Sequence, residues 1–386
     1  MRITWVTRSF LDYRIPIYQE IDILSGHNLT LIYNGEVVPN RCTQRMKEIL
    51  GDRCIPMEGE MRLMGKKKNP VSNSKGKGVR IPIQKGLISA IKKSKPDVIL
   101  TDGFFQWTYA PLLMKIFGSK WKHVMCYEGW SHTERNMQGF RIKYRKMAMR
   151  WMDRICCNGT LCYNYVKSLG YPEQKLSLGN MAADTAFFSN AYKEITTRQK
   201  EEHRKNEGIM GLSYIFSGRL VQLKGVMEML KAWKVFSADK DVYLSLIGDG
   251  SEKESLQKYI VDNKIRNVIF KGFVEYRNLP IYYSSADCFI IPTLQDNWSL
   301  VVPEAMSCGL PVLSSIYNGC YPELVTEKNG WTFDPLNTAS LIEALEKSYV
   351  AREKLSEMGK MSSTIASRFT PELVAKSIYT ACQNVL

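Results

Sequence analysis

Residues 214–236 read YIFSGRLVQLKGVMEMLKAWKVF. The segment starts with an aromatic and apolar run that is typical of a buried strand, and its last twelve residues repeat apolar side chains at helical spacing. The loop between them holds a glycine and two cations, Arg219 and Lys224. A strand, a basic loop and a helix in this order form the repeating unit of a parallel α/β sheet.

The same alternation extends in both directions along the chain. In the second half, strands are expected at 242–248, 267–272, 288–293 and 311–315, and in the first half at 3–7, 29–33, 97–103 and 123–129. We therefore predict an α/β protein of two Rossmann-like, doubly wound domains that face each other across a cleft. Residues 1–185 form the first domain, residues 186–370 form the second, and residues 371–386 form a C-terminal helix that can cross back to the first.

Two segments do not fit the alternation. Residues 189–211 are polar and without a clear pattern, which indicates a linker. Residues 62–85 are basic and rich in Gly, Ser and Asn, which indicates a mobile loop. A single long helix is expected at 340–359.

The charge of +15 lies entirely in the first half, where residues 1–185 hold 30 Lys and Arg against 15 Asp and Glu. Such a field favours a polyanionic partner: nucleic acid, anionic lipid or a substrate that carries phosphate. No nucleic-acid-binding motif accompanies it. The ten cysteines have no metal-binding spacing, so we expect buried thiols, and the chain lacks a signal-peptide pattern and a membrane-length apolar run. These features favour a cytoplasmic protein that can lie on a membrane surface.

Ligands of parallel sheets bind beyond the carboxyl ends of the strands. Gly218, Arg219 and Lys224 follow one strand at the start of a helix, and the two cations there suit a diphosphate. Alternatively, Arg219 pairs with a carboxylate and Lys224 is merely solvated. Glu304 lies in the first turn of another helix, where it can stabilise the helix dipole or accept hydrogen bonds from a ribose diol. Asp296, after the strand at 288–293, is expected to meet a sugar.

Five pieces of the second half together resemble the nucleotide-sugar half of retaining family 4 glycosyltransferases, which have the GT-B fold. They are SGRLVQLKG (217–225), LIGDGSEKESL (246–256), FKGFV (270–274), the stretch 292–315 and YPELVTEKNGWTFDP (321–335). The resemblance covers roughly 120 residues in the family's order.

The resemblance implies a role for each matching position. Arg219 and Lys224, beside Gly218, would bind the donor diphosphate, and Glu304 would hold the ribose. Asp296 stands where the family usually has Glu, and Ser299 stands where glycine is common; the acid would steady positive charge at the anomeric carbon. Phe273 and Val274 would lie beside the base. The backbone from Asn297 through Trp298 and Ser299 to Leu300 would contact the phosphate and the donor sugar.

The first half fits the family more loosely and is expected to bind the acceptor. Its first loop has no glycine pair, so any phosphate contact there falls to other backbone amides, to Arg8 or to Arg14. Glu128 is the candidate catalytic residue of this half, although a buried ion pair with an arginine would give the same pattern. Asp102 and His132 are the acceptor-binding candidates, and His132 can equally be a surface residue of the polar loop WSHTERN (130–136).

The pattern at 140–154 predicts a basic amphipathic helix, with Arg141, Arg145 and Lys146 among apolar residues. Such a helix can lie on anionic lipid, or can simply pack on the sheet. The triplet Asp239-Lys240-Asp241 precedes a strand at the wrong edge for a donor metal, so no metal or other cofactor is expected.

The resulting prediction is a retaining glycosyltransferase of the hexosyltransferase type. It would move a sugar from a UDP- or GDP-sugar to a glycan hydroxyl, on a lipid-linked acceptor of surface polysaccharide biosynthesis. A nucleotide-sugar 2-epimerase on the same scaffold and a non-catalytic nucleotide or glycan binder are the alternatives.

Overall fold

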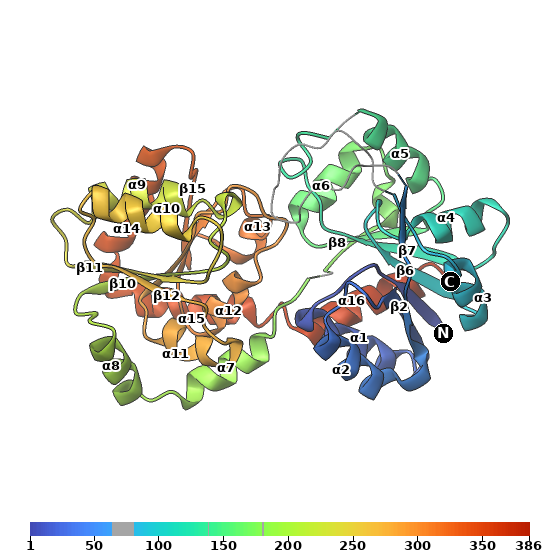
Figure 1. Cartoon of the computed structure of the whole chain (residues 1–386), viewed down its shortest axis with the longest axis horizontal. Coiled ribbons are helices and arrows are strands. Elements are labelled where there is room, and N and C mark those ends of the chain that lie inside the picture. The colour runs from blue at the N-terminus through green and yellow to red at the C-terminus, as the bar shows by residue number, and fades with distance from the viewer. Residues whose placement is uncertain (64–80, 138, 180) are drawn as a thin grey trace.

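The computed structural model describes residues 1–63, 81–137, 139–179 and 181–386 as two α/β domains (Figure 1). The sheet of the first domain has seven parallel strands in the order β3-β2-β1-β6-β7-β8-β9. These strands are β1 (Ile3–Val6), β2 (Leu29–Asn34), β3 (Cys54–Met57), β6 (Val98–Asp102), β7 (Lys122–Tyr127), β8 (Arg154–Cys157) and β9 (Leu176–Leu178). The buried apolar runs of the sequence therefore form the central strands.

Helices cover both faces of this sheet. Residues of α1 (Ile15–Leu24) and α2 (Asn40–Leu50) share one apolar core with β1 and β2. The other face carries α3 (Leu87–Ser94), α4 (Tyr109–Ile116), α5 (Gly139–Met149) and α6 (Thr160–Ser168). Successive strand residues alternate between these cores, as β geometry requires.

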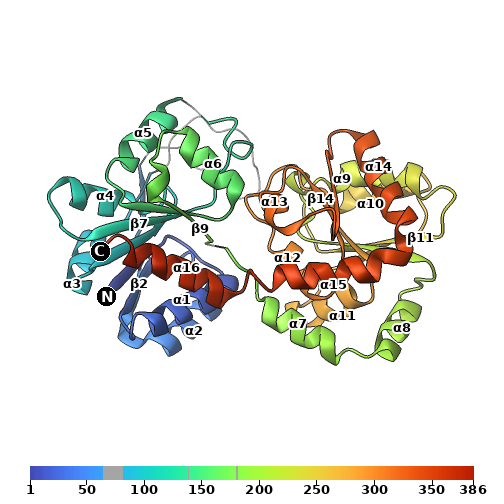
Figure 2. The same cartoon turned by 180° about the vertical axis from the view of Figure 1, so that it is seen from behind.

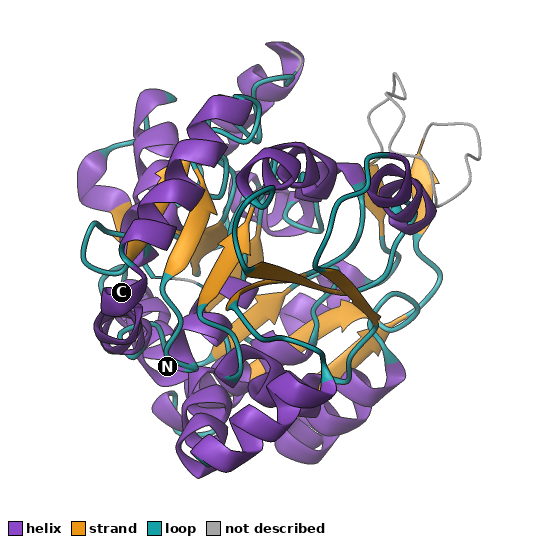
Figure 3. Cartoon of the chain, turned by 90° about the vertical axis from the view of Figure 1, so that its left-hand side faces the viewer, coloured by secondary structure: helices purple, strands orange, loops and turns teal. Residues whose placement is uncertain are grey.

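The sheet of the second domain has six parallel strands in the order β12-β11-β10-β13-β14-β15. They are β10 (Leu212–Ser217), β11 (Val242–Ile247), β12 (Val268–Gly272), β13 (Cys288–Ile291), β14 (Val312–Ser315) and β15 (Gly330–Phe333). This is the strand order of a doubly wound nucleotide-binding sheet, and Figure 3 shows strands enclosed by helices. The predicted fold class is confirmed.

The helices of the second domain correct two expectations. Residues 189–211 are not a linker, because α7 (Thr185–Glu194) and α8 (Thr197–Asn206) occupy most of them. The expected single helix at 340–359 is two helices, α14 (Thr338–Val350) and α15 (Leu355–Ala366). The remaining helices are α9 (Val226–Phe236), α10 (Lys253–Asp262), α11 (Leu279–Ser284), α12 (Val301–Ser307) and α13 (Tyr321–Leu324).

The C-terminal helix α16 (Pro371–Gln383) lies on the first domain, beside α1 (Figure 2). Val374, Ile378 and Cys382 are buried in the same apolar core as β1 and β2. The chain thus crosses between the domains twice.

The basic segment 62–85 begins and ends in a small antiparallel ribbon of β4 (Met61–Leu63) and β5 (Ile81–Ile83). Residues 64–80, on which the mobile-loop prediction rests, lie outside the described residues. Each of the ten cysteines is a buried free thiol, as predicted.

Candidate functional site

A cavity of about 260 Å³ lies where the carboxyl ends of β10 and β13 face the first domain. Arg219, Val221, Leu223 and Lys224 line it from the loop after β10, and Gln295, Asp296 and Asn297 line it from the loop after β13. Thr133 of the first domain closes the other side. The structure thus brings three of the predicted site residues together with Arg219.

Two glycines allow the loops around this cavity to approach each other. Gly225 has φ +65°, and a Cβ there would lie 2.0 Å from the carbonyl oxygen of Pro292. A Cβ on Gly248 would lie 1.9 Å from the carbonyl oxygen of Gly218. Gly218 therefore packs against the loop after β11, and any larger residue at 225 or 248 would push the cavity walls apart.

The two cations of the cavity are in different states. Arg219 is exposed and has no hydrogen-bond or ion-pair partner among the described residues. Lys224 is half-buried and forms an ion pair with Asp296, with 2.5 Å between Nζ and Oδ2. The alternative in which Arg219 is paired and Lys224 is solvated is therefore wrong on both counts.

The Asp296 carboxylate is held by the second domain on both of its oxygens. The Ser299 hydroxyl donates to Oδ2 at 2.6 Å, and the backbone N–H of Trp298 donates to Oδ1 at 3.1 Å. Ser299, which stands where the family commonly has glycine, therefore fixes the orientation of the shorter acid.

The expectation that the amides of 297–300 all face a ligand is only partly correct. The N–H of Trp298 points to Asp296, and that of Ser299 donates to Asn318 Oδ1. Within the described parts of the chain, the amides of Asn297 and Leu300 have no protein acceptor. The Trp298 side chain is buried against Phe369 rather than open to the cavity.

Glu304, in the first turn of α12, is only 7% exposed. Burial raises its pKa from 4.5 to about 8, while hydrogen bonding from Tyr276 acts in the opposite direction and Asp184 adds to the rise. In this state, Glu304 is a largely protonated acid at neutral pH. Near the same end of the sheet, Phe273 is 72% exposed and Val274 packs on the core of the domain.

In the first domain, the predicted acids form one cluster around Arg14. This buried arginine lies 3.0 Å from Glu128 and 3.9 Å from Asp102. The pKa of each acid is raised, mainly by burial, and Asp296 adds to the rise at Glu128. Glu128 is thus in an ion pair with an arginine, the alternative noted from sequence, while it faces the second domain.

Neither arginine of the first loop is available for phosphate in this arrangement. Arg14 belongs to the acid cluster, and Arg8 pairs with the buried Glu60 at 2.8 Å. The same Glu60 oxygen accepts from the Trp107 indole N–H at 2.9 Å. The two arginines are therefore in ion pairs inside the domain, and a phosphate contact from the backbone amides of this loop stays a prediction.

His132 is half-buried and contacts the second domain. Its Nε2 lies 2.8 Å from the carbonyl oxygen of Leu294, and its ring stacks on Tyr317 with 4.2 Å between centroids. It is therefore more than a surface residue of a polar loop, and its acceptor-binding role stays a prediction.

Residues 196–363 match the family model of glycosyl transferases group 1. The second domain is a glycosyl transferases group 1 domain. In sequence, the chain is similar to a D-inositol 3-phosphate glycosyltransferase of Pseudarthrobacter chlorophenolicus, with 24% identity over 51% of this chain and 47% of that protein. It is also similar to a GDP-mannose-dependent monoacylated alpha-(1-6)-phosphatidylinositol monomannoside mannosyltransferase of Corynebacterium glutamicum, with 29% identity over 39% of this chain and 42% of that protein.

The matched part thus spans about half the length of these curated relatives. Over the whole chain, the structure is similar to Anabaena HepE in complex with UDP, with a TM-score of 0.76, 15% sequence identity and 100% coverage of both chains. The chain therefore has the GT-B fold.

Outside the glycosyl transferases group 1 domain, the basic helix differs from its prediction. α5 ends at Met149, and Arg145 is buried in an ion pair with Glu134 at 2.9 Å and a hydrogen bond to the Tyr165 hydroxyl. Arg141 lies over the Phe105 ring. The exposed face of the region carries a mixture of apolar and basic residues: Phe140, Lys143, Lys146, Met147, Arg150 and Trp151.

The described residues contain no group of three His, Cys, Asp or Glu side chains that could hold a metal ion. Asp239 pairs with Lys240 on the surface. Within the described parts of the chain, none of the helices has the length and apolar composition needed to span a bilayer.

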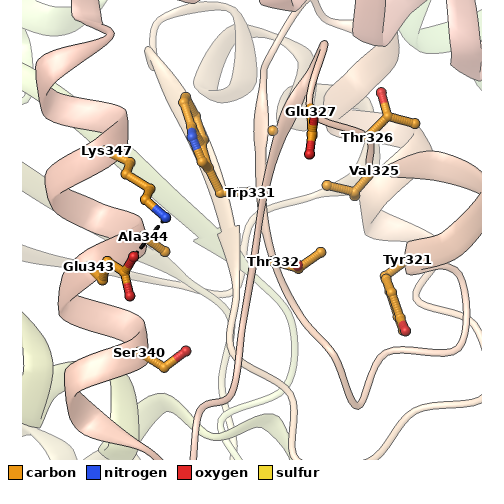
Figure 4. Close-up of a pocket in the computed structure, with 11 residues that line it drawn as sticks. Tyr321, Val325, Thr326, Glu327, Trp331, Thr332, Ser340, Glu343, Ala344 and Lys347 are labelled. Carbon is orange, nitrogen blue, oxygen red and sulfur yellow. Dashed lines mark ion pairs between the residues drawn. The ribbon is translucent and has the colours of Figure 1, made fainter.

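A second cavity of about 370 Å³ lies along β15, the edge strand of the group 1 domain (Figure 4). Trp331 and Tyr321 line it, together with the ion pair of Glu343 and Lys347 on α14. Thr326, which precedes β15, also lines this cavity. The cavity therefore flanks β15 and does not lie beyond the carboxyl end of the strand. None of the predicted site residues reaches it.

The structure also shows functional candidates that sequence reasoning did not find. They are side chains that join the two domains beside the first cavity: Trp130, Asn158 and Tyr317. All follow or lie near strand ends, which is the signal that could have pointed to them.

Proposed function

We propose that the chain is a retaining glycosyltransferase that moves a sugar, of the hexose type, from a UDP- or GDP-sugar to a hydroxyl of a glycan. The observation that carries the proposal is the cavity at the strand ends, where Arg219 and Lys224 precede α9 and Asp296 lies opposite. The group 1 family match supports it, as do relatives named for glycosyl transfer and a similar structure in complex with UDP.

The departing nucleoside diphosphate carries the negative charge of the reaction. Arg219 has no partner among the described residues, and Lys224 has only the carboxylate of Asp296. A diphosphate in the cavity would pair with both cations, which stabilises the charge as it develops. Two cations and the start of α9 would do this without a metal ion.

Asp296 would steady the positive charge that develops at the anomeric carbon. Its carboxylate is already oriented by Ser299 and by the Trp298 amide, so little reorganisation is needed when the donor binds. Transfer with retention would then give an α-linkage from an α-linked donor.

Glu304 would accept hydrogen bonds from the ribose hydroxyls. In this structure, Tyr276 interacts with the acid, so the ribose would replace or add to this interaction. A diol donates two hydrogen bonds to one carboxylate, which favours its ionised form.

The acceptor hydroxyl would bind on the first-domain side of the cleft. Glu128 is partly exposed there, with 32% of its side chain accessible, and its charge interacts with that of Asp296. We propose that Glu128 orients the incoming hydroxyl, while Arg14, which also contacts Asp102, holds Glu128 in place.

A lipid-linked acceptor would bring the first domain to an anionic membrane at its cytoplasmic face. The exposed residues of α5 suit such a surface, because Phe140, Met147 and Trp151 are apolar and Lys143 and Lys146 are cationic. Co-sedimentation with phosphatidylglycerol vesicles, and not with phosphatidylcholine vesicles, would support this; replacement of both lysines by Glu should abolish it.

The decisive experiment incubates the chain with UDP- and GDP-sugars and a glycan acceptor. Product that needs the acceptor supports transfer, an isomerised sugar indicates an epimerase, and nucleotide binding without turnover indicates a binder. Arg219→Ala or Lys224→Ala should lower turnover at least tenfold, while Arg266→Ala, at the amino end of β12, should not. Near-normal turnover in both cavity variants would refute the diphosphate site.

A further inference from the structure

Four consecutive residues after β13, which we call the donor loop (294–297), receive hydrogen bonds from side chains of the first domain. The bonds run from His132 Nε2 to Leu294 O at 2.8 Å, from Arg135 Nη1 to Gln295 Oε1 at 3.0 Å, from Trp130 Nε1 to Asp296 O at 3.0 Å, and from Asn158 Nδ2 to Asn297 O at 2.9 Å. Three of the four acceptors are backbone carbonyls, so these contacts fix the path of the loop whatever its side chains do.

Two of the donors are buried, which makes their bonds hard for water to replace. Trp130 is 8% exposed and Asn158 is 4% exposed. His132 is half-buried, and burial lowers its pKa, so the ring is neutral and carries its proton on Nε2, since a carbonyl can only accept. Its stack on Tyr317 fixes the ring plane.

The donor loop transmits this restraint to both charged groups of the cavity. The carbonyl of Asp296 accepts from Trp130 and from the amide of Gly319, while its carboxylate is bound to Lys224. At the start of the same loop, the amide of Leu294 donates to the carbonyl of Leu223, the neighbour of Lys224, at 2.8 Å. The first domain thus adds a hydrogen bond to an Asp296 backbone that the second domain also holds, while the second domain alone holds the carboxylate.

The packing leaves the loop no room to shift. A Cβ on Gly319 would lie 2.0 Å from the carbonyl oxygen of Asn297 and 3.1 Å from Trp130 Nε1. The indole N–H of the first domain is therefore close to the Asn297 carbonyl and the Gly319 backbone of the second domain, and a separation of the domains removes the indole while Asn297 and Gly319 stay in contact.

We propose that Trp130, His132 and Asn158 are positioning residues that place Asp296 for catalysis only while the two domains are in contact. The proposal rests on the proposed glycosyl transfer. When a nucleotide sugar binds to the second domain alone, the donor loop lacks its hydrogen bonds from the first domain. The contact between the domains would therefore do more than cover the cleft. Cleavage of the donor by water is thereby suppressed until the domains close.

The test uses variants that keep the shape of each side chain and remove its hydrogen bond to the donor loop; Asn158 also loses a 3.4 Å hydrogen bond to the carbonyl of Glu128. Trp130→Phe and His132→Phe keep an aromatic ring, and Asn158→Leu keeps the volume. Each should lower kcat about tenfold, the order expected for one buried hydrogen bond, with less than a threefold change in the affinity for the nucleotide sugar.

Glu323→Leu, which removes the acceptor oxygens and keeps a similar volume, is the matched control. Glu323 accepts a hydrogen bond from the Thr160 amide at the start of α6, so it joins the same two domains without touching the donor loop. If this variant lowers kcat as much as Trp130→Phe, domain contact alone matters and the positioning role is overturned.

Hydrogen exchange of the peptide that covers the donor loop separates this proposal from the proposed function. Trp130→Phe should speed exchange there at least fivefold, and Glu323→Leu should not. Unchanged exchange in Trp130→Phe overturns the proposal whatever the turnover, and so does faster exchange with unchanged kcat. If the wild-type chain turns over no nucleotide sugar, the proposed function fails, and the positioning of Asp296 for catalysis fails with it.

Discussion

Replacing Glu304 by Gln tests whether this acid is buried as a neutral group. Its pKa rises from 4.5 to about 8 in the folded chain because burial disfavours the ionised form. Between these values the folded state binds a proton that the unfolded state has lost, so stability falls as pH rises. The contribution is complete below pH 4.5 and is lost as pH rises through about 8.

The size of the effect follows from the shift. One pKa unit corresponds to about 1.4 kcal/mol, so wild-type stability should fall by ~4 kcal/mol between pH 5 and pH 8 through this group alone. The amide side chain introduced by Glu304→Gln cannot ionise and would remove that fall. The free energy of unfolding, measured in urea at both pH values, should therefore favour Glu304→Gln over wild type by ~4 kcal/mol more at pH 8 than at pH 5.

Glu254→Gln, an exposed acid on α10, is the matched control and should leave the pH dependence unchanged. If wild type and Glu304→Gln lose stability in parallel between the two pH values, Glu304 ionises normally and the reasoning is refuted.

The same acid links donor binding to pH. If the ribose hydroxyls bind the ionised form of Glu304, about 1 in 100 molecules has this form at pH 6 and about half have it at pH 8. Donor affinity should therefore rise about fiftyfold over that interval, with proton release visible by calorimetry in buffers of different ionisation enthalpy. A donor affinity that is flat from pH 6 to pH 8 would contradict ribose binding by this carboxylate.

Three further outcomes are expected. Gly319→Ala should destabilise the closed arrangement by ~2 kcal/mol and lower turnover, because its Cβ would meet the Asn297 carbonyl, whereas Gly139→Ala has open space and should be neutral in activity assays. Arg145→Met should cost ~3 kcal/mol in urea unfolding, because it leaves the Glu134 carboxylate without its partner; a loss below ~1 kcal/mol would contradict a buried pair. Turnover should persist in excess EDTA, and complete loss that Mg²⁺ restores would show that a metal is needed.

The central strands of both sheets could be predicted because buried parallel strands are short, continuous apolar runs. The helices α7 and α8 were missed for the opposite reason. α8 has no buried residue, so its sequence has no apolar repeat at helical spacing that would predict a helix. Its start was nevertheless encoded, because Thr196 and Gln199 form a capping box.

The positions of the site residues could be predicted more easily than the interactions between their side chains. Arg219, Lys224, Asp296 and Asn297 do meet at one cavity, because the carboxyl ends of neighbouring parallel strands share an edge. The ion pair of Lys224 with Asp296 joins residues 72 positions apart. The spacing of residues along the chain predicts the edge of the sheet that each side chain reaches. It does not predict with which of several nearby charges that side chain forms an ion pair.

The contacts of His132 show a limit of a different kind. Its two predicted roles, acceptor binding and simple exposure, did not include a contact with the other domain. In a two-domain sheet protein, the carboxyl ends of both sheets border one cleft, so polar groups after a strand of one domain face the backbone carbonyls after a strand of the other. Trp130, His132 and Asn158 each donate to such a carbonyl. Hydrogen-bond donors at the strand ends of one domain should therefore first be tested for contacts with loops at the strand ends of the other domain, such as the donor loop. Only then should they be assigned to substrate binding.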